Sequence, residues 1–277
     1  MAKADAKTEA RARREQAQAA AQAAARRTRN LQLLGGTVAA AVVVVLLVVI
    51  LSGGKETPKQ GVGADTSAAL EGVAATRSLL DGVEQHGLTL GDPKAPITML
   101  EFLDVQCPFC RDHQLDQQPT VIKDLVRTGK IQLRMQPVAL PQMGEDSEAG
   151  RAVVLRESHV DKAWDFVNLF YLNQGDEGTG YVTAAYLQRL LGAIPGATKD
   201  VTRTIDARDE KLASEIDEHA KAIAEKYAAD GKNFGTPAFA IARTGAKIDD
   251  YEPVYIESDD GAGTLAAAVA RLAARNR

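Results

Sequence analysis

The stretch GDPKAPITMLEFLDVQCPFC, residues 91–110, decides the fold of this chain. Its first six residues favour a turn, and the apolar run at 97–105 is typical of a buried central strand. Cys107 and Cys110 are the only cysteines, and they follow that strand directly with C-x-x-C spacing. Two thiols spaced in this way can form half of a zinc site, a structural disulfide or a redox centre.

The setting of the two cysteines favours the redox centre. A helix is predicted over 114–130, with a kink at Pro119. Cys107 is expected at the start of the helix that follows the strand, where unpaired backbone N–H groups and the helix dipole stabilise a thiolate. Cys110, one turn further on, can resolve a mixed disulfide. Pro108 suits the first helical turn because its missing N–H would have no partner there.

The zinc and structural alternatives have less support. A structural zinc site needs about four ligands, and the chain has no second cysteine pair. His113 is interpreted as a solvated helix residue, and the other three histidines show no metal-ligand spacing. A cysteine pair this close in sequence closes too short a loop to act as a useful structural disulfide. We therefore predict no metal site and no cofactor.

The rest of the pattern predicts a mixed α/β domain. From 145 to 230, apolar residues recur at three- and four-residue spacing, which indicates a block of helices. Four aromatic residues of this block are interpreted as core: Trp164, Phe166, Phe170 and Tyr171. Further strands are predicted at 131–138, 236–242 and 253–257, and a last helix at 263–276. This order gives an α/β fold with a helical insertion over about 145–230.

The N-terminal part predicts a membrane anchor. Residues 33–51 contain no charged side chain, and as a helix they would span roughly 28 Å, close to the thickness of a bilayer core. A cleaved signal peptide is the alternative, but the polar leader is long and no A-x-A motif lies just after the apolar run. The predicted organisation is a basic leader at 1–30, a transmembrane helix at 31–51, a linker with a short helix at 52–86 and a catalytic domain at 87–277.

The charges beside the apolar run set its predicted orientation. Arg26, Arg27 and Arg29 precede it, whereas only Lys55 and Lys59 closely follow it. The positive-inside rule then places the N-terminus in the cytoplasm and the domain outside the cell membrane. The net charge of −4 gives no overall nucleic-acid signal.

The chain resembles the DsbA-like family of thioredoxin-fold thiol–disulfide oxidoreductases, in particular its single-pass, membrane-anchored members. The resemblance rests on residues 91–110, on AWDFVNLFYLNQG within the helical insertion and on GTPAFAIA at 235–242. It covers the chain from about Gly87 onward. The order of strand with CPFC, helical insertion and Thr-Pro strand makes it specific, and it implies a thioredoxin-like fold.

The resemblance assigns roles to residues far apart in the sequence. It implies that Pro237 is a cis proline lying against the dithiol, and that the backbone of Thr236 pairs with an extended client segment. It also implies that Glu101 moves a proton to or from Cys110. A carboxyl group in an apolar strand has a raised pKa, which suits that exchange. The alternative is a solvent-facing Glu101 at a strand edge.

The dipeptide between the cysteines departs from the family's best-known strong oxidant, which has a histidine where this chain has Phe109. Because phenylalanine brings no charge, the Cys107 thiolate depends on the helix terminus, and we expect a Cys107 pKa below that of a free thiol but not extreme. Pro108 and Phe109 are expected at the client-binding surface, where Phe109 offers an apolar contact to clients or a membrane partner. Local packing is the alternative for Phe109.

The predicted function is disulfide formation in exported proteins that carry free thiols. A separate membrane redox partner, linked to quinone, is expected to reoxidise the dithiol. Disulfide reductase or isomerase activity remains an alternative, because direction depends on reduction potential and partner. The same residues would also suit a non-catalytic redox-sensing or binding module, or a dithiol that handles heme or copper.

Overall fold

The computed structural model describes residues 70–201, 205–256 and 259–275. All of them belong to one compact unit, residues 60–277. The predicted leader at 1–30, the predicted transmembrane helix at 31–51 and the linker up to residue 69 lie outside the described residues. Within the described ranges, no helix combines the length and apolar character that crossing a bilayer requires.

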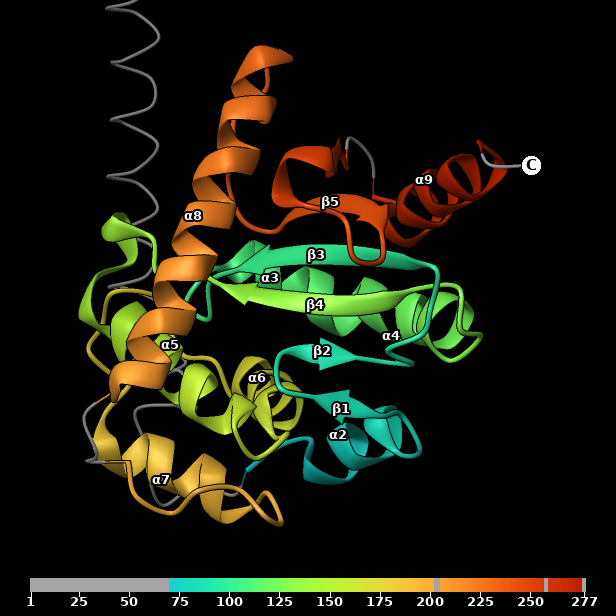
Figure 1. Cartoon of the computed structure of the whole chain (residues 1–277). Coiled ribbons are helices and arrows are strands. Elements are labelled where there is room, and N and C mark those ends of the chain that lie inside the picture. Colours follow the sequence, from blue (N-terminus) through green and yellow to red (C-terminus); the bar gives the residue numbers. More distant parts are fainter. Residues whose placement is uncertain (1–69, 202–204, 257–258, 276–277) are drawn as a thin grey trace, which may run out of the picture. The chain divides into compact units, whose positions relative to one another are not determined.

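A six-stranded sheet forms the centre of the unit, in the order β1-β2-β4-β3-β5-β6 (Figure 1). The central strand β3 has every residue buried, as its apolar run predicts. It pairs in parallel with β4 and antiparallel with β5. The strands are β1 Gln85–His86, β2 Thr89–Leu90, β3 Ile97–Leu103, β4 Gln132–Pro137, β5 Ala238–Arg243 and β6 Glu252–Val254.

The four strands predicted from the sequence are confirmed, with ends that differ by at most three residues. The hairpin β1–β2 was not predicted, because two-residue strands carry too little alternation to be recognised. It is held by the rest of the unit rather than by its own pattern. The indole Nε1 of Trp164 donates to the carbonyl of Leu88 at 3.1 Å, and the N–H of Gly87 donates to the carboxylate of Asp161 at 2.6 Å.

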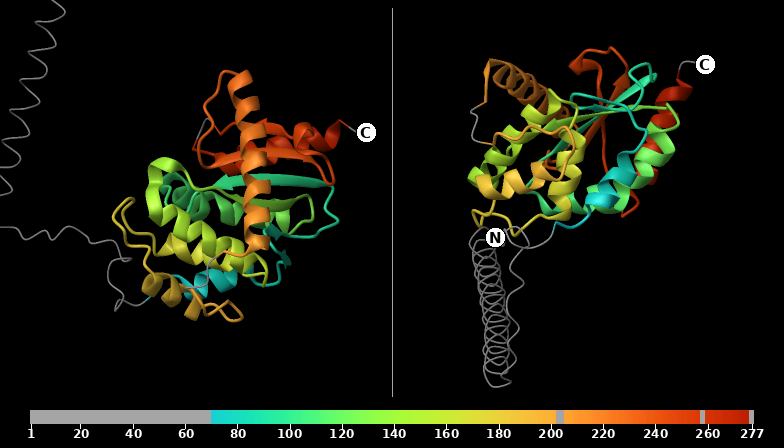
Figure 2. Two further views of the ribbon diagram at one scale, coloured as in Figure 1. Left: turned by 60° about the vertical axis from the view of Figure 1, so that its left-hand side comes forward. Right: turned by 90° about the horizontal axis from the view of Figure 1, so that it is seen from below.

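Helices cover both faces of the sheet (Figure 2). The helices α3 and α4 follow β3, and α9, which comes after β6, packs against α4, whereas α8 lies on the other face, in contact with β4 and β6. The helices are α2 Val73–Leu80, α3 Pro108–Asp112, α4 Gln118–Val121, α5 Gly144–Ser158, α6 Ala163–Leu172, α7 Ala184–Gly192, α8 Ala207–Ala229 and α9 Gly261–Ala274. Short 3-10 turns occur at Pro141–Met143 and Ile248–Asp250.

The helical insertion predicted at about 145–230 is formed by α5 to α8. Its aromatic residues are core, as predicted: Trp164, Phe166, Phe170 and Tyr171 are fully buried. Phe170 contacts the rings of Tyr181 and Tyr186, and these rings extend the core that is continuous with the sheet. The short helix predicted within 52–86 is observed as α2, which packs against α6.

The helix predicted at 114–130 is irregular near Pro119, as expected, and the irregularity consists of two π-helical turns. Two π-helical turns, η2 His113–Gln117 and η3 Ile122–Val126, flank the four residues of α4. At the first turn the backbone N–H of Gln118 donates to the carbonyl of His113, five residues earlier. Pro119 has no N–H to donate, which removes one regular helical bond at this point. The widened turn thus brings His113 and Gln118 onto the same side of the helix.

Candidate active site

The dithiol lies where β3 turns into α3. The chain leaves β3 at Leu103, and the N–H of Cys107 donates to the carbonyl of Asp104 at 3.0 Å, which closes a tight turn. Cys107 is the N-cap of α3 in an extended conformation, and Pro108 occupies the first helical position. This is the placement predicted from the C-x-x-C motif.

The environment separates the acidities of the two thiols. Both cysteines are free thiols, and each is 2% exposed. A hydrogen bond with the Cys110 thiol lowers the pKa of Cys107 to about 6, against its burial, and Thr236 and the backbone at Cys110 and Phe109 lower it further. Burial raises the pKa of Cys110 well above 9, and the neighbouring Cys107 adds to the rise. Cys107 is therefore the thiolate of the pair at neutral pH, in the direction that the sequence predicts.

The loop before β5 lies against Cys107. The Thr236–Pro237 peptide bond is cis, as the resemblance implies. The Cys107 thiol donates to the backbone carbonyl of Thr236, with Sγ and O 3.3 Å apart. A cavity of about 360 Å³ opens beside this loop and is also lined by Lys232 and Tyr255.

Glu101 is a buried residue, so the alternative of a solvent-facing strand edge is wrong. It is 1% exposed and lies between Met135 of β4 and Phe239 of β5 in the sheet register. Burial raises the pKa of Glu101 to about 8, although a hydrogen bond from Gln118 opposes the rise. The Nε2 of Gln118 donates to Oε2 of Glu101 at 2.9 Å. The carboxyl group is therefore mostly protonated at neutral pH and can give up a proton near pH 8.

His113 corrects a prediction. The sequence interpretation as a solvated helix residue is wrong, because His113 is 6% exposed and packs against the ring of Phe239, with 4.9 Å between centroids. It lies three residues after Cys110, on the same buried face of the helix. Its Nε2 is 3.1 Å from Oε1 of Gln118 and 3.9 Å from Oε1 of Glu101. Burial lowers the pKa of His113 to about 4, so the ring is neutral at physiological pH.

The dipeptide between the cysteines is exposed. Phe109 is 71% exposed, which excludes local packing as its role, and Pro108 is exposed beside it. The two residues therefore present apolar surface directly beside the dithiol. The structure thus brings Cys107, Cys110, Thr236 and Pro237 together, with the apolar pair exposed between the cysteines and Glu101 buried in β3, the strand that leads to them.

The helical insertion holds the turn that carries Cys107, and sequence reasoning missed this. The Tyr171 hydroxyl donates to the carbonyl of Asp104 at 2.9 Å, and the Gln174 side chain donates to the carbonyl of Val105 at 2.7 Å. The side chain of Gln106 donates to the Tyr181 hydroxyl at 2.8 Å. Tyr171 was interpreted as core only, and no sequence pattern signals bonds between residues so far apart along the chain.

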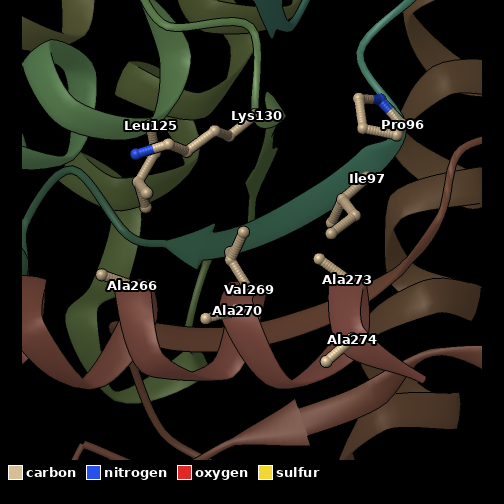
Figure 3. A pocket seen from close by; sticks show the side chains of 9 residues that line it. All are labelled: Pro96, Ile97, Leu125, Lys130, Ala266, Val269, Ala270, Ala273 and Ala274. Carbon is tan, nitrogen blue, oxygen red and sulfur yellow. The ribbon is translucent and has the colours of Figure 1, made fainter. Parts of the chain in front are cut away.

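Two other features lie away from the dithiol. The side chains of His159, Asp206 and Asp209 place possible metal-ligating atoms within 4.8 Å of one another, but both aspartates form the capping box of α8. A cavity of about 470 Å³ lies between α9 and Ile97 at the start of β3, the end opposite the dithiol (Figure 3). Apart from Lys130 its lining is apolar, including Leu125 and Val269.

A reactive cysteine at a helix N-terminus, a buried second cysteine and a cis-proline loop beside them define a thioredoxin-like dithiol protein. The sequence supports this class independently. Residues 84–254 match a family model described as Thioredoxin, and the chain belongs to that family.

Curated relatives share part of this sequence. Over 144 residues the chain is 28% identical to a probable disulfide bond formation protein D of Bacillus cereus, covering 51% of this chain and 61% of the relative. The disulfide bond formation protein D of Bacillus subtilis is 29% identical over 98 residues, covering 35% of this chain and 44% of the relative. The chain thus spans less than two thirds of the length of these relatives.

Solved structures are similar as well. A thioredoxin-like oxidoreductase from Silicibacter pomeroyi is 23% identical, with a TM-score of 0.48, and the match covers 73% of this chain and 98% of that chain.

Proposed function

We propose that this protein is an extracytoplasmic thiol–disulfide oxidoreductase that forms disulfides in exported proteins through Cys107 and Cys110. The observation that carries the proposal is the Cys107 thiol at the N-terminus of α3, 3.3 Å from the carbonyl of Thr236 and acidified to a pKa of about 6. The names of the Bacillus relatives, disulfide bond formation protein D, support the same activity.

The different acidities of the two cysteines suit two successive exchange steps. A client thiolate attacks Sγ of Cys107 in the Cys107–Cys110 disulfide. A mixed disulfide between the client and Cys107 forms, the Cys107–Cys110 bond breaks, and Cys110 leaves with the electron pair. Because Cys110 has a pKa well above 9, it is a poor leaving group as a thiolate, and a proton from Glu101 completes its departure as a thiol. A second client thiolate then attacks the client sulfur and releases Cys107, which is a good leaving group because its pKa is about 6. Two electrons pass from the client to the dithiol.

Client binding is proposed at the exposed rim of the dithiol. Phe109 and Pro108 offer apolar surface that an unfolded client can cover. The backbone of Thr236 is proposed to pair with an extended client segment, which makes recognition depend on main-chain groups. The exposure of Phe109 and the position of Thr236 beside Cys107 support both proposals.

Location and reoxidation are proposed from the sequence. The uncharged run at 33–51 would anchor the chain in the cell membrane, and the preceding arginines would keep the N-terminus in the cytoplasm. The domain would then face outward, where disulfides persist. A separate membrane partner linked to quinone would accept the two electrons from the reduced dithiol.

Client oxidation by the full chain tests the activity. The oxidised protein is mixed with a reduced, unfolded client, and the loss of client thiols is followed. We expect Cys107→Ser to abolish client oxidation. Cys110→Ser, which cannot form the internal disulfide, should also oxidise no client, but its Cys107 thiolate should attack a disulfide-bonded client and accumulate a mixed disulfide with it. Client oxidation that persists in the Cys107→Ser variant would overturn the proposal and favour a non-catalytic module.

The direction of electron flow is tested by equilibrium with glutathione. A reduction potential near about −120 mV for the Cys107–Cys110 couple supports an oxidase, whereas one near about −270 mV supports a reductase.

A further inference from the structure

A buried hydrogen-bonded chain of three side chains joins the helical segment that follows the dithiol to strand β3. Gln118 is fully buried, and its Nε2 donates to Oε2 of Glu101 at 2.9 Å. The other end of the same amide, Oε1, is 3.1 Å from Nε2 of His113. Because that amide oxygen can only accept, His113 must donate and therefore carries its proton on Nε2. The three groups form one directed chain, from His113 through Gln118 to Glu101.

We propose that Gln118 and His113 are positioning residues for proton exchange between Glu101 and Cys110: Gln118 holds the Glu101 carboxyl group, and His113 holds the Gln118 amide. The inference rests on the proposed function, because that function gives Glu101 its role. It adds two residues that hydrogen-bond to each other and to Glu101 rather than to the reacting sulfur atoms.

The local backbone explains why these two side chains meet. The N–H of Gln118 donates to the carbonyl of His113 in the π-helical turn η2, so the two residues are joined through both backbone and side chain. π-helical turns are rare in proteins, and those that occur often lie at functional sites. Pro119 favours the widened turn because it has no N–H. The turn therefore fixes the direction of the amide as well as its distance from Glu101.

The same helix face carries the cysteine that exchanges the proton. Cys110 and His113 are three residues apart and both are buried toward the sheet. Besides His113, Tyr171 of α6 is the titratable group shown to act on Glu101, and it also interacts electrostatically with Cys107, Cys110 and Asp104. The paired strands β4 and β5 contribute only Met135 and Phe239 at this register.

Proton exchange needs both states of Glu101 to be accessible. Burial strongly favours the neutral carboxyl group of Glu101. The side-chain Nε2–H of Gln118 stabilises the carboxylate that remains after the proton has left. His113 supplies no charge, because its pKa is about 4, and so it acts through the orientation of the amide. Without it, the amide can rotate and present its oxygen to the carboxylate.

The titration of Glu101 in the full chain tests the inference without any client. The carboxyl carbon is followed by NMR against pH, and its signal is assigned by its loss in Glu101→Gln. We expect Gln118→Met to raise the midpoint by about 1–2 pH units, since a hydrogen bond to a charged group contributes roughly 1.5–3 kcal/mol. His113→Phe should raise it less. In the double variant the midpoint should equal that of Gln118→Met alone, because His113 acts through the amide.

Gln114→Met is the matched control. Gln114 is equally buried in the same π-helical turn, and its Oε1 has no hydrogen-bond partner among the described residues. The Glu101 midpoint should not move in this variant. If Gln118→Met does not fold, Gln118→Asn serves instead, because a shorter amide cannot span both partners. Folding is checked by circular dichroism.

Two results would overturn the inference. One is an unchanged Glu101 midpoint in a folded Gln118 variant, and the other is a His113→Phe shift that persists in the Gln118→Met background. A wild-type protein that oxidises no client at any pH would instead refute the proposed function and leave the titration result standing. Where client oxidation is observed, its pH profile should move upward with the Glu101 midpoint in the Gln118 variants and not in the control.

Discussion

The hydroxyl group of Tyr171 donates a hydrogen bond of 2.9 Å to the backbone carbonyl of Asp104, the same oxygen that accepts the N–H of Cys107 at 3.0 Å. Tyr171 belongs to α6 of the helical insertion, whereas Asp104 begins the turn between β3 and α3. One carbonyl oxygen thus joins the insertion to the N-cap of the catalytic helix. The insertion therefore helps to shape the site as well as extending the core of the sheet.

Tyr171→Phe should lower the stability of the protein and raise the pKa of Cys107, because the turn that carries Cys107 loses a hydrogen bond. The ring keeps its packing, but a buried carbonyl loses one of two donors, so we expect unfolding free energy to fall by about 1–2 kcal/mol and the Cys107 pKa to rise. Tyr186→Phe is the control, because its hydroxyl donates to the carbonyl of Asn173 at 3.0 Å, away from the dithiol. Denaturant unfolding and thiolate absorbance measure the two effects. Equal Cys107 titrations in both variants would contradict a role of Tyr171 at the site.

Thiolate absorbance should also give a Cys107 midpoint near pH 6 in the reduced wild-type protein. Thr236→Val removes a hydroxyl group from the residue that helps to lower this pKa, so the midpoint should rise by roughly half a pH unit to one unit. Thr264→Val is the control, since its hydroxyl donates to the carbonyl of Asp260 at the start of α9. A wild-type midpoint near that of a free thiol would refute the assignment of Cys107 as the nucleophile.

Glu101→Gln should stabilise the protein in a pH-dependent way. Burial raises the pKa of Glu101 from 4.5 to about 8, so its favourable contribution is complete below pH 4.5 and is lost as pH rises toward 8. A glutamine cannot ionise. The unfolding free energy of the variant should therefore exceed that of the wild-type protein by an amount that grows between pH 4.5 and pH 8 to a few kcal/mol. Denaturant unfolding at several pH values measures it, with exposed Glu225→Gln as the control. An advantage that is independent of pH would contradict the raised pKa. Client oxidation should fall roughly 100-fold or more in the same variant.

The sequence predicted the parts of the fold that have strong local patterns. The apolar run at 97–105 and the C-x-x-C motif at its end lie as expected, and Trp164 is core because helical spacing of aromatic residues is a reliable signal. The hairpin β1–β2 was missed, since its strands are too short to carry alternation and are fixed by contacts such as that of Trp164 with Leu88.

The site was predictable only where a motif or a resemblance marked it. Cys107, Cys110 and Pro237 were found in this way, whereas His113 was assigned to the wrong face. A regular helix offers no reason for residues five apart to face each other, and the π-helical turn that joins His113 to Gln118 has no established sequence pattern. The hydrogen bonds of the insertion to the turn before Cys107 depend on tertiary contacts that local spacing does not encode.

Phe109→Ala should separate client binding from chemistry. Because Phe109 is 71% exposed, its removal should change unfolding free energy by less than about 0.5 kcal/mol. The KM for an unfolded client should rise several-fold, since covering this side chain contributes up to roughly 1.5–3 kcal/mol, while kcat stays unchanged. Val160→Ala, another exposed apolar residue, is the control and should leave KM unchanged. An unaltered KM for Phe109→Ala would remove Phe109 from the client-binding surface.

Gly150 should tolerate no larger side chain, because α5 packs closely against the turn that carries the dithiol. A Cβ atom added at Gly150 would overlap the Cγ2 atom of Val105, two residues before Cys107. Both positions are buried, so the overlap must be relieved by rotating the Val105 side chain within a packed core or by moving α5 or that turn. We expect Gly150→Ala to lower unfolding free energy by about 1–3 kcal/mol, as overpacking of a core does, and to slow client oxidation because the turn shifts. Gly192→Ala in α7 is the matched control, because its added Cβ would meet no atom within 4 Å and a helical alanine is favoured over glycine. Denaturant unfolding of both variants, with client oxidation beside it, checks the prediction, and a Gly150→Ala protein as stable as the Gly192→Ala protein would show that the insertion and the active-site turn are not closely packed.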